Sequence, residues 1–405
     1  MKAGWRLVPL EGVASFFNGL WTGKKGPFTT AKVIRNTNFR PHGVLSFDDI
    51  AEIEVEERQL EKRQLQFGDI VIEKSGGGPK QAVGRVVAFE LADDGYSFSN
   101  FTSAIRVNDP SQLHYRFLLH ALNWWYVSGV TEKIQSNSTG IRNLDFGAYK
   151  ALPIPLPPLD EQKRIVAFLD EAFEGLSRAR ANTEANLADA RELFNQMRSS
   201  FFSQPSPTWA THMLSEVCEK ITDGTHQTPK YFESGHVFLS SRNVTSGRID
   251  WENVKFIDDS QHVEMQRRVS PRRGDVLLAK NGTTGVGAIV DRDISFDIYV
   301  SLALLRAKAG LLPELLLHFI NSAAAKQQFN GRLKGSGVPN LHLKEIREVT
   351  ISYPKDENEQ RDIVARIEEV LEAKTEMEAA LQTKLRLIDT LRQSLLQKAF
   401  SGELT

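Results

Sequence analysis

Two long segments of the chain carry apolar residues at spacings of three and four positions, which is the pattern of a helix with one apolar stripe. The first stripe runs from Ile165 to Phe201, and the second runs from Ile363 to Ala399. Because this spacing is close to a heptad repeat, the pattern predicts two long helices that pack on each other as a coiled coil.

Prolines and acidic residues mark where both helices begin. Four prolines between positions 153 and 158 precede Asp160, and a proline likewise precedes Asp356. We expect each aspartate to cap its helix, because acidic groups near the first turn suit the positive end of the helix dipole. The first helix should end before Pro205 and the second at Gly402, since proline and glycine stop helices.

Shorter elements precede each long helix. The β-rich runs Gly68–Ile72 and Val83–Phe89 flank a glycine-rich loop, which predicts a hairpin. Val276–Leu278 and Ala288–Val290 flank a similar loop in the second half of the chain. The segments with a helical pattern are Tyr115–Trp125 and Leu315–Gln328.

The second half of the chain repeats the first half. The matched segments are Trp5 with Trp209, Gly68–Lys74 with Gly274–Lys280, Leu118–His120 with Leu316–His318, Gly140–Leu144 with Gly337–Leu341, Glu161–Gln162 with Glu359–Gln360, and Phe202–Ser203 with Phe400–Ser401. The matches keep the same order throughout, which indicates an internal duplication. The histidines of the third pair lie in apolar helices, so we interpret them as core residues.

The duplication and the helices together predict an α+β fold. Two pseudo-symmetric globular domains would be joined by two long antiparallel coiled-coil helices, if the second helix returns along the first. The expected boundaries are 1–153 for the first domain, 154–205 for the central helix, 206–353 for the second domain and 354–405 for the C-terminal helix.

Composition narrows the class of protein. No run of 18 apolar residues occurs, so we expect no membrane span. The first residues lack the apolar core of a secretion signal, and the single cysteine, Cys218, fits a reducing compartment, so we expect a cytoplasmic protein. The net charge of −1 neither suggests nor excludes a nucleic-acid partner.

The chain shows no convincing catalytic or cofactor motif. There is no phosphate-binding G-x-x-x-x-G-K-[ST] loop, no nucleophile elbow, no Asn-Pro-Pro-Tyr segment of an adenine methyltransferase, and no metal-ligand spacing of histidine and cysteine. We therefore expect no catalytic residues, no bound metal and no cofactor, which leaves a binding protein as the best interpretation.

Several loops combine lysine or arginine with small polar residues, as DNA-contacting loops do. Such side chains contact phosphates and base edges. The candidate DNA-binding residues are Lys74, Ser75, Gly76, Lys80, Arg142, Asn143, His226, Gln227, Thr228, Lys230, Arg272, Arg273, Lys280, Asn281, Thr283, Thr284, Lys334 and Asn340. For any single loop, a solvated turn explains the same residues, because glycine, asparagine and serine favour turns.

The chain resembles the DNA specificity subunits of type I restriction–modification systems along its whole length. The resemblance rests on the joints between domain and helix, Leu152–Val166 and Ile351–Val364, on Asp223–Pro229, and on the ending Lys398–Leu404. The second joint reads Ile-Ser-Tyr-Pro where the first reads Ile-Pro-Leu-Pro, which is a mild departure.

The resemblance implies that each globular part is a target recognition domain that reads one half of a split, asymmetric site in double-stranded DNA. It implies that the helices set the gap between the half-sites and hold two methyltransferase subunits. Those partners would carry S-adenosylmethionine and methylate adenine, and ATP-dependent restriction subunits could join them. This chain would bind neither cofactor.

Two other interpretations remain open from the sequence. A fused methyltransferase or nuclease with its own recognition domain would need a catalytic motif, which the sequence does not show. A coiled-coil scaffold that joins two adaptor domains without binding DNA would share the repeat and the helices. Sequence-preferring DNA binding would distinguish the specificity subunit from this scaffold.

Overall fold

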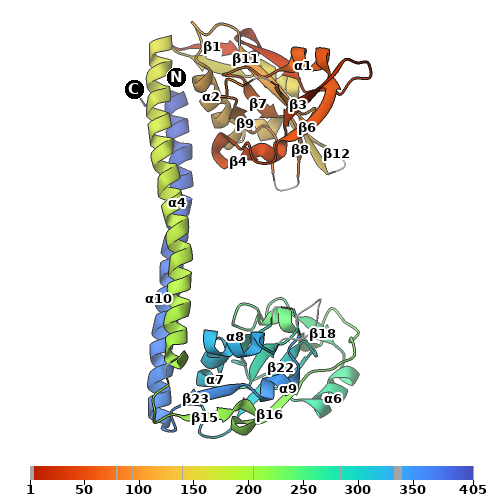
Figure 1. The fold of residues 1–405 in the computed structure, drawn as a ribbon, viewed down its shortest axis with the longest axis vertical. Coiled ribbons are helices and arrows are strands. Elements are labelled where there is room, and N and C mark those ends of the chain that lie inside the picture. The colour runs from red at the N-terminus through yellow and green to blue at the C-terminus, as the bar shows by residue number, and fades with distance from the viewer. Residues whose placement is uncertain are drawn as a thin grey trace. The chain divides into compact units, whose positions relative to one another are not determined.

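The computed structural model describes residues 4–78, 81–93, 95–138, 140–203, 205–282, 284–332 and 340–404. The chain forms two compact units, unit 1 with residues 1–183 and 383–405, and unit 2 with residues 184–382. The long helices α4 (Leu159–Ser203) and α10 (Glu357–Ser401) cross the boundary (Figure 1), so each unit contains one globular domain and part of both helices.

The centre of unit 1 is an antiparallel sheet in the order β2–β11–β7–β9. Its strands are β2 (Ala14–Asn18), β11 (Thr102–Val107), β7 (Ile70–Glu73) and β9 (Val86–Ala88). Successive side chains of a strand point to opposite faces. Ile70 and Ile72 accordingly pack on the core shared with α2 (Tyr115–Val127) and the long helices, and Val71 packs on a second core beneath a smaller sheet.

Further sheets surround this centre. In the sheet β10–β3–β6, β10 (Tyr96–Phe98) is parallel to β3 (Phe28–Ile34), and β6 (Ala51–Glu56) is antiparallel to it. A second sheet has the order β12–β13–β8, from Gln135–Ser138, Ile141–Leu144 and Ser75–Gly77. Two strand pairs are β1–β14, from Arg6–Pro9 and Pro153–Leu156, and β4–β5, from Phe39–Arg40 and Val44–Leu45. Two short helices, α1 (Glu57–Arg63) and α3 (Phe146–Ala151), complete the unit.

Unit 2 repeats this plan. Its central antiparallel sheet is β16–β22–β19–β20, from Cys218–Asp223, Leu302–Ala307, Val276–Ala279 and Val286–Ile289. The other sheets are β18–β17–β21, from Lys255–Ile257, His236–Leu239 and Phe296–Ile298, and β15–β23, from Ala210–Met213 and Thr350–Tyr353. Its helices are α5 (Leu214–Val217), α6 (Asp259–Arg268), α7 (Pro313–Ile320), α8 (Ala323–Asn330) and α9 (Leu343–Arg347).

The structure confirms most of the predicted elements and corrects two. Both hairpins form, β7 with β9 and β19 with β20. The prediction of one helix over residues 315–328 is wrong, because Ser322 caps a new helix, α8, by accepting from Ala325 N. The prediction that Asp160 caps the first long helix is also wrong, since α4 already begins at Leu159. Asp356 does precede α10 and accepts a hydrogen bond from Asn358 N.

The two long helices run antiparallel within each unit. In unit 1 the guanidinium of Arg392 lies 3.8 Å from the ring centre of Phe173, and Arg180 forms an ion pair with Asp389. In unit 2 Arg191 donates to Glu378 at 2.9 Å. Residues later in α4 therefore contact residues earlier in α10, as antiparallel helices require. Within the described residues, no helix combines the length and apolar character that a membrane span requires.

Candidate nucleic-acid interface

Unit 1 brings two of the predicted loops together on one small sheet. The glycine-rich segment forms β8, which pairs with β13, so that Ser75 lies opposite Asn143. The hydroxyl of Ser75 donates to Asn143 Oδ1 at 2.5 Å, and Leu144 N donates to Lys74 O at 2.8 Å. The sequence indicated each loop as a DNA contact, but nothing local in it predicted this pairing.

Lys74 leaves the central sheet at the end of β7. Its ammonium lies 3.4 Å from Asn18 Oδ1 on β2, and no acidic side chain pairs with it among the described residues. Burial lowers the pKa of Lys74, and the charge of Lys150 lowers it further. Arg142 pairs with Glu132 at 3.1 Å. Gly76 has a φ of +104°, a conformation that favours glycine.

Unit 2 repeats the geometry with different side chains. The backbone of Asn281 forms an isolated antiparallel β-bridge with that of Asn340, in the way that Ser75 pairs with Asn143 in unit 1. Leu341 N donates to Lys280 O at 2.9 Å, which matches the bond from Leu144 to Lys74. Within the part of unit 2 that is described, the side-chain oxygens of Asn281 and Asn340 are buried without a hydrogen-bond partner.

A buried carboxylate organises the strand ends of unit 2. Asp223 ends β16 with a 3% exposed side chain, and it lies 3.3 Å from the ammonium of Lys280. Arg268 donates to Asp223 Oδ1 at 2.6 Å, and His226 Nε2 lies 3.2 Å from the same oxygen. Burial raises the pKa of Asp223, but the hydrogen bonds from Arg268 and His226 and the charge of Lys280 outweigh burial and hold the pKa below its usual value.

The segment after Asp223 is held against two other elements. The hydroxyls of Thr228 and Tyr299 lie 3.4 Å apart. Lys230 N donates to Gln261 Oε1 at 2.9 Å, and its ammonium lies over the ring of Phe232. Gln227 is exposed between them. The backbone of this segment is therefore ordered, while polar side chains face solvent.

The remaining candidates do not all join this group. Arg272 and Arg273 precede β19, at the opposite end of the strand from Lys280, and Arg272 donates to Glu219 at 2.8 Å. Thr284 follows the tip of the hairpin and donates its backbone N–H to Gly282 O. The candidates that lie outside the described residues are Lys80, Thr283 and Lys334.

Sequence reasoning did not select Asn18, Asp223 and Arg268 as site residues, although Asn18 contacts Lys74, Asp223 contacts Lys280, and Arg268 donates to Asp223. A usable signal was present, because Asn18-Gly19 and Asp223-Gly224 are corresponding Asx-Gly pairs in the duplication. A Cβ on Gly19 would lie 1.9 Å from Ser99 O, and one on Gly224 would lie 1.8 Å from Ile298 O. Only glycine fits at either position, so the two pairs mark equivalent places in the two domains.

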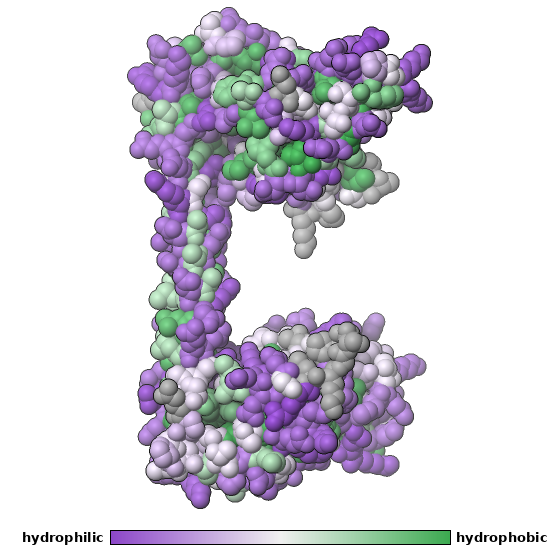
Figure 2. All heavy atoms as spheres, viewed as in Figure 1, coloured by the Kyte–Doolittle hydropathy of each residue, from purple (hydrophilic) through white to green (hydrophobic). Residues whose placement is uncertain are grey.

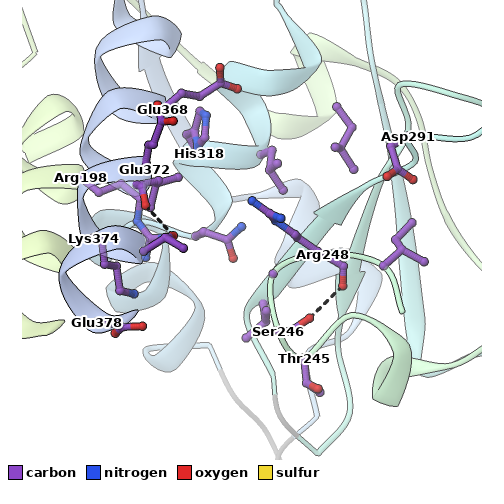
Figure 3. Close-up of a pocket in the computed structure, with 18 of the residues that line it drawn as sticks. Arg198, Thr245, Ser246, Arg248, Asp291, His318, Glu368, Glu372, Lys374 and Glu378 are labelled. Carbon is purple, nitrogen blue, oxygen red and sulfur yellow. Dashed lines mark hydrogen bonds between the residues drawn. The ribbon is translucent and has the colours of Figure 1, made fainter. Parts of the chain in front are cut away.

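A separate cleft of about 910 Å³ lies in unit 2 between the domain and the long helices (Figure 3). Arg198, Lys326 and Lys374 line it together with Glu368 and Glu372, so its charges are mixed. Among its described lining residues there is no candidate DNA-binding residue. The described part of the chain also holds no group of three or more histidine, cysteine or acidic side chains placed to bind a metal.

Comparison with known proteins gives one consistent result. The family model for the type I restriction modification DNA specificity domain matches residues 4–185 and 207–387. The EcoKI specificity subunit of Escherichia coli strain K12 is 25% identical over 435 residues, covering 100% of this chain and 90% of that protein. The EcoBI specificity subunit of Escherichia coli is 23% identical and covers 72% of this chain and 66% of that protein.

Solved structures show the same fold. A chain from a study of the assembly and conformational transition of the type I R-M system has a TM-score of 0.80 at 21% identity, and the match covers 100% of this chain and 99% of that one. The HsdS subunit from Thermoanaerobacter tengcongensis has a TM-score of 0.60 at 20% identity, with 100% and 98% coverage.

Proposed function

Because the chain belongs to the type I restriction–modification DNA specificity family, we propose that it reads a split site in double-stranded DNA and directs partner methyltransferase subunits to it. Each unit would read one half-site. The observation that carries the proposal is the repeated arrangement of a lysine at the end of a central strand beside a pair of polar side chains, Lys74 with Ser75 and Asn143, and Lys280 with Asn281 and Asn340.

The chemistry of this arrangement suits DNA. Asparagine and arginine present hydrogen-bonding groups of the kind that bind base edges, and lysine, serine and backbone N–H groups bind phosphates. The side chains differ between the units at equivalent positions, as Ser75 and Asn281 do. Different side chains on one scaffold would let the two units read different half-sites, which supports an asymmetric target.

The long helices offer surface for the partner subunits. Exposed apolar side chains on them include Phe168, Leu193, Met197, Met377, Leu387 and Leu391. Figure 2 shows apolar positions among hydrophilic ones along the helices, and both domains also present a mixed surface. Where such side chains form a contiguous patch, they mark a protein contact. We assign it to two methyltransferase subunits, which would bring S-adenosylmethionine, and to ATP-dependent restriction subunits where these assemble.

The chain itself would recognise DNA without catalysing a reaction and would act in the cytoplasm. Rigorously purified chain is expected to transfer no labelled methyl group from S-adenosylmethionine to DNA, whereas the complex with its methyltransferase transfers it. Methyl transfer by the isolated chain would favour the fused enzyme instead. No observation favours the scaffold, which predicts a complex without any preference among DNA sequences.

An exchange of one domain tests the proposed function. Residues 14–144 are replaced by the equivalent segment of a relative, leaving β1 and β14 unchanged because they pair with each other. All candidate residues of unit 1 lie in this segment. We expect one half of the methylated motif to change and the other to remain, as measured by methylome sequencing. A change in both halves would contradict independent reading, and the same exchange in unit 2 is the matched control.

A further inference from the structure

The two units place the same lysine beside different partners. Asn18 lies opposite Ser103 in the sheet of unit 1, and Asp223 lies opposite Ala303 in the sheet of unit 2. A glycine that tolerates no Cβ follows each of them. Asn18 and Asp223 therefore occupy equivalent positions in the two units. Asn18 faces Lys74, which follows β7, and Asp223 faces Lys280, which follows β19.

The difference changes the charge at this position. Lys74 meets the neutral amide of Asn18 at 3.4 Å, whereas Lys280 meets the carboxylate of Asp223 at 3.3 Å. The Lys280 side chain is only 6% exposed. In unit 1 the lysine thus keeps a positive charge without an acidic partner among the described residues, and in unit 2 the same charge is neutralised inside the domain.

Asp223 also holds two exposed side chains. Arg268 is 47% exposed and comes from the end of α6, and His226 is 62% exposed and comes from the loop that follows β16. Arg268 makes a second bond, from Nε to the backbone oxygen of Asp223 at 3.2 Å. A charge-assisted pair of bonds to one residue fixes the guanidinium more firmly than a single bond would. The carboxylate is thus buried while the donors that it orients reach the surface.

We propose that Asp223 is a positioning residue that determines how unit 2 contacts DNA, by neutralising Lys280 and by holding Arg268 and His226 at the surface as the contacting side chains. Unit 1 has Asn18 in place of this carboxylate, and the ammonium of Lys74 itself contacts DNA. The inference rests on the proposed function, since it assigns the DNA contacts within that same interface. Unit 2 contacts DNA through oriented donors, whereas unit 1 uses a lysine charge beside its polar strand pair.

Reciprocal exchanges test the inference in the complex of the full chain with its methyltransferase subunits. Asp223→Asn gives unit 2 the residue of unit 1, and Asn18→Asp gives unit 1 the residue of unit 2. Two quantities are measured: the methylated motif in cells, and the salt dependence of binding to a short duplex of random sequence. Each phosphate contact contributes about 0.9 to the slope of log affinity against log salt concentration.

For Asp223→Asn we expect the second half of the motif to become relaxed, because Arg268 and His226 are no longer held. The salt slope should steepen by about 0.9, because Lys280 regains an unpaired charge. For Asn18→Asp we expect the slope to become shallower by about 0.9, because Lys74 is neutralised. Lys74→Met should have the same effect on the slope.

The double variant Asp223→Asn with Lys280→Met separates the two roles. It removes one charge of each sign, so the salt slope should return to that of the wild type while the motif stays relaxed. A purely structural role for Asp223 predicts a lower melting temperature with an unchanged motif and slope, and that result would overturn the proposal. A wild-type complex without sequence preference would instead refute the proposed function.

Discussion

His120 and His318 occupy equivalent positions in the two units but meet different neighbours. Both are 6% exposed, as expected for core histidines. His120 Nε2 lies 2.8 Å from Asp170 Oδ1, a carboxylate that also pairs with Arg116. His318 Nε2 has no hydrogen-bond partner in the part of unit 2 that is described. Burial lowers the pKa of His318 to about 4, and the charge of Arg198 on the facing helix contributes (Figure 3).

This difference predicts that unit 2 loses stability in acid. The pKa of His318 is lower in the folded chain than its ordinary value of 6.5, so the unfolded chain binds the proton first as the pH falls. Stability is therefore complete above about pH 6.5 and decreases toward pH 4, with a loss of about 2 kcal/mol at pH 5.

The measurement is urea unfolding of unit 2 at several pH values, followed by hydrogen exchange. His318→Leu should flatten the pH dependence relative to the wild type. His212→Gln, which changes a more exposed histidine of the same unit, should leave it intact. Equal pH profiles for the wild type and His318→Leu would show that this histidine does not control the transition.

At the scale of elements, one buried glutamine joins each domain to its long helix. Gln162 on α4 accepts from His114 N and donates to Gln112 O and Pro157 O at 2.8–2.9 Å. Gln360 on α10 repeats the set with Leu312 N, Gly310 O and Pro354 O. Both side chains are completely buried. The glutamine therefore ties three backbone segments together where sheet, loop and helix meet.

We expect Gln162→Ala to destabilise unit 1 by about 2–5 kcal/mol, because it leaves up to three buried or part-buried backbone groups without their partner. Urea unfolding measures the effect. The control is Gln196→Ala on the unit 2 part of the same helix, where the amide donates to exposed Glu192 and to no other group among the described residues, and the expected change is within about 0.5 kcal/mol. If both variants lost the same free energy of unfolding, the hydrogen bonds of Gln162 would not stabilise the joint between domain and helix.

At the scale of the whole molecule, two helices connect the units, and their length is proposed to set the gap between the half-sites. The units meet at Thr183–Glu184 in α4 and at Gln382–Thr383 in α10. The pairs Arg180–Asp389 and Arg191–Glu378 lie on either side of these points. An insertion in one helix alone would shift one of these pairs by a turn, so both helices must be lengthened together.

Four residues inserted after Glu184 and four after Gln382 would lengthen both helices by about 6 Å and turn them only about 40° past a full circle. We expect the methylated motif to keep both half-sequences and to gain one to two base pairs in its gap, since each base pair adds about 3.4 Å. Methylome sequencing measures the gap. An assembled, active complex with an unchanged gap would assign the spacing to the partner subunits.

The sequence by itself determined the repeated parts of this protein. Apolar spacing, flanking prolines and the duplicated segments indicated both long helices, both hairpins and the two-domain plan, because these signals act between residues that are close along the chain. The joints between domain and helix carried the family resemblance that the comparisons confirmed. Local chemistry further indicated that Ser75 and Asn143 belong to polar segments, although not that these segments form strands or that the two side chains touch.

Tertiary structure alone decided which side chains meet. Lys74 and Lys280 look alike in sequence, yet one faces Asn18 and the other faces Asp223, because strands from distant parts of the chain are aligned in the sheet. Such contacts follow from the register between strands and from packing, and a one-residue change in register turns every side chain to the opposite face.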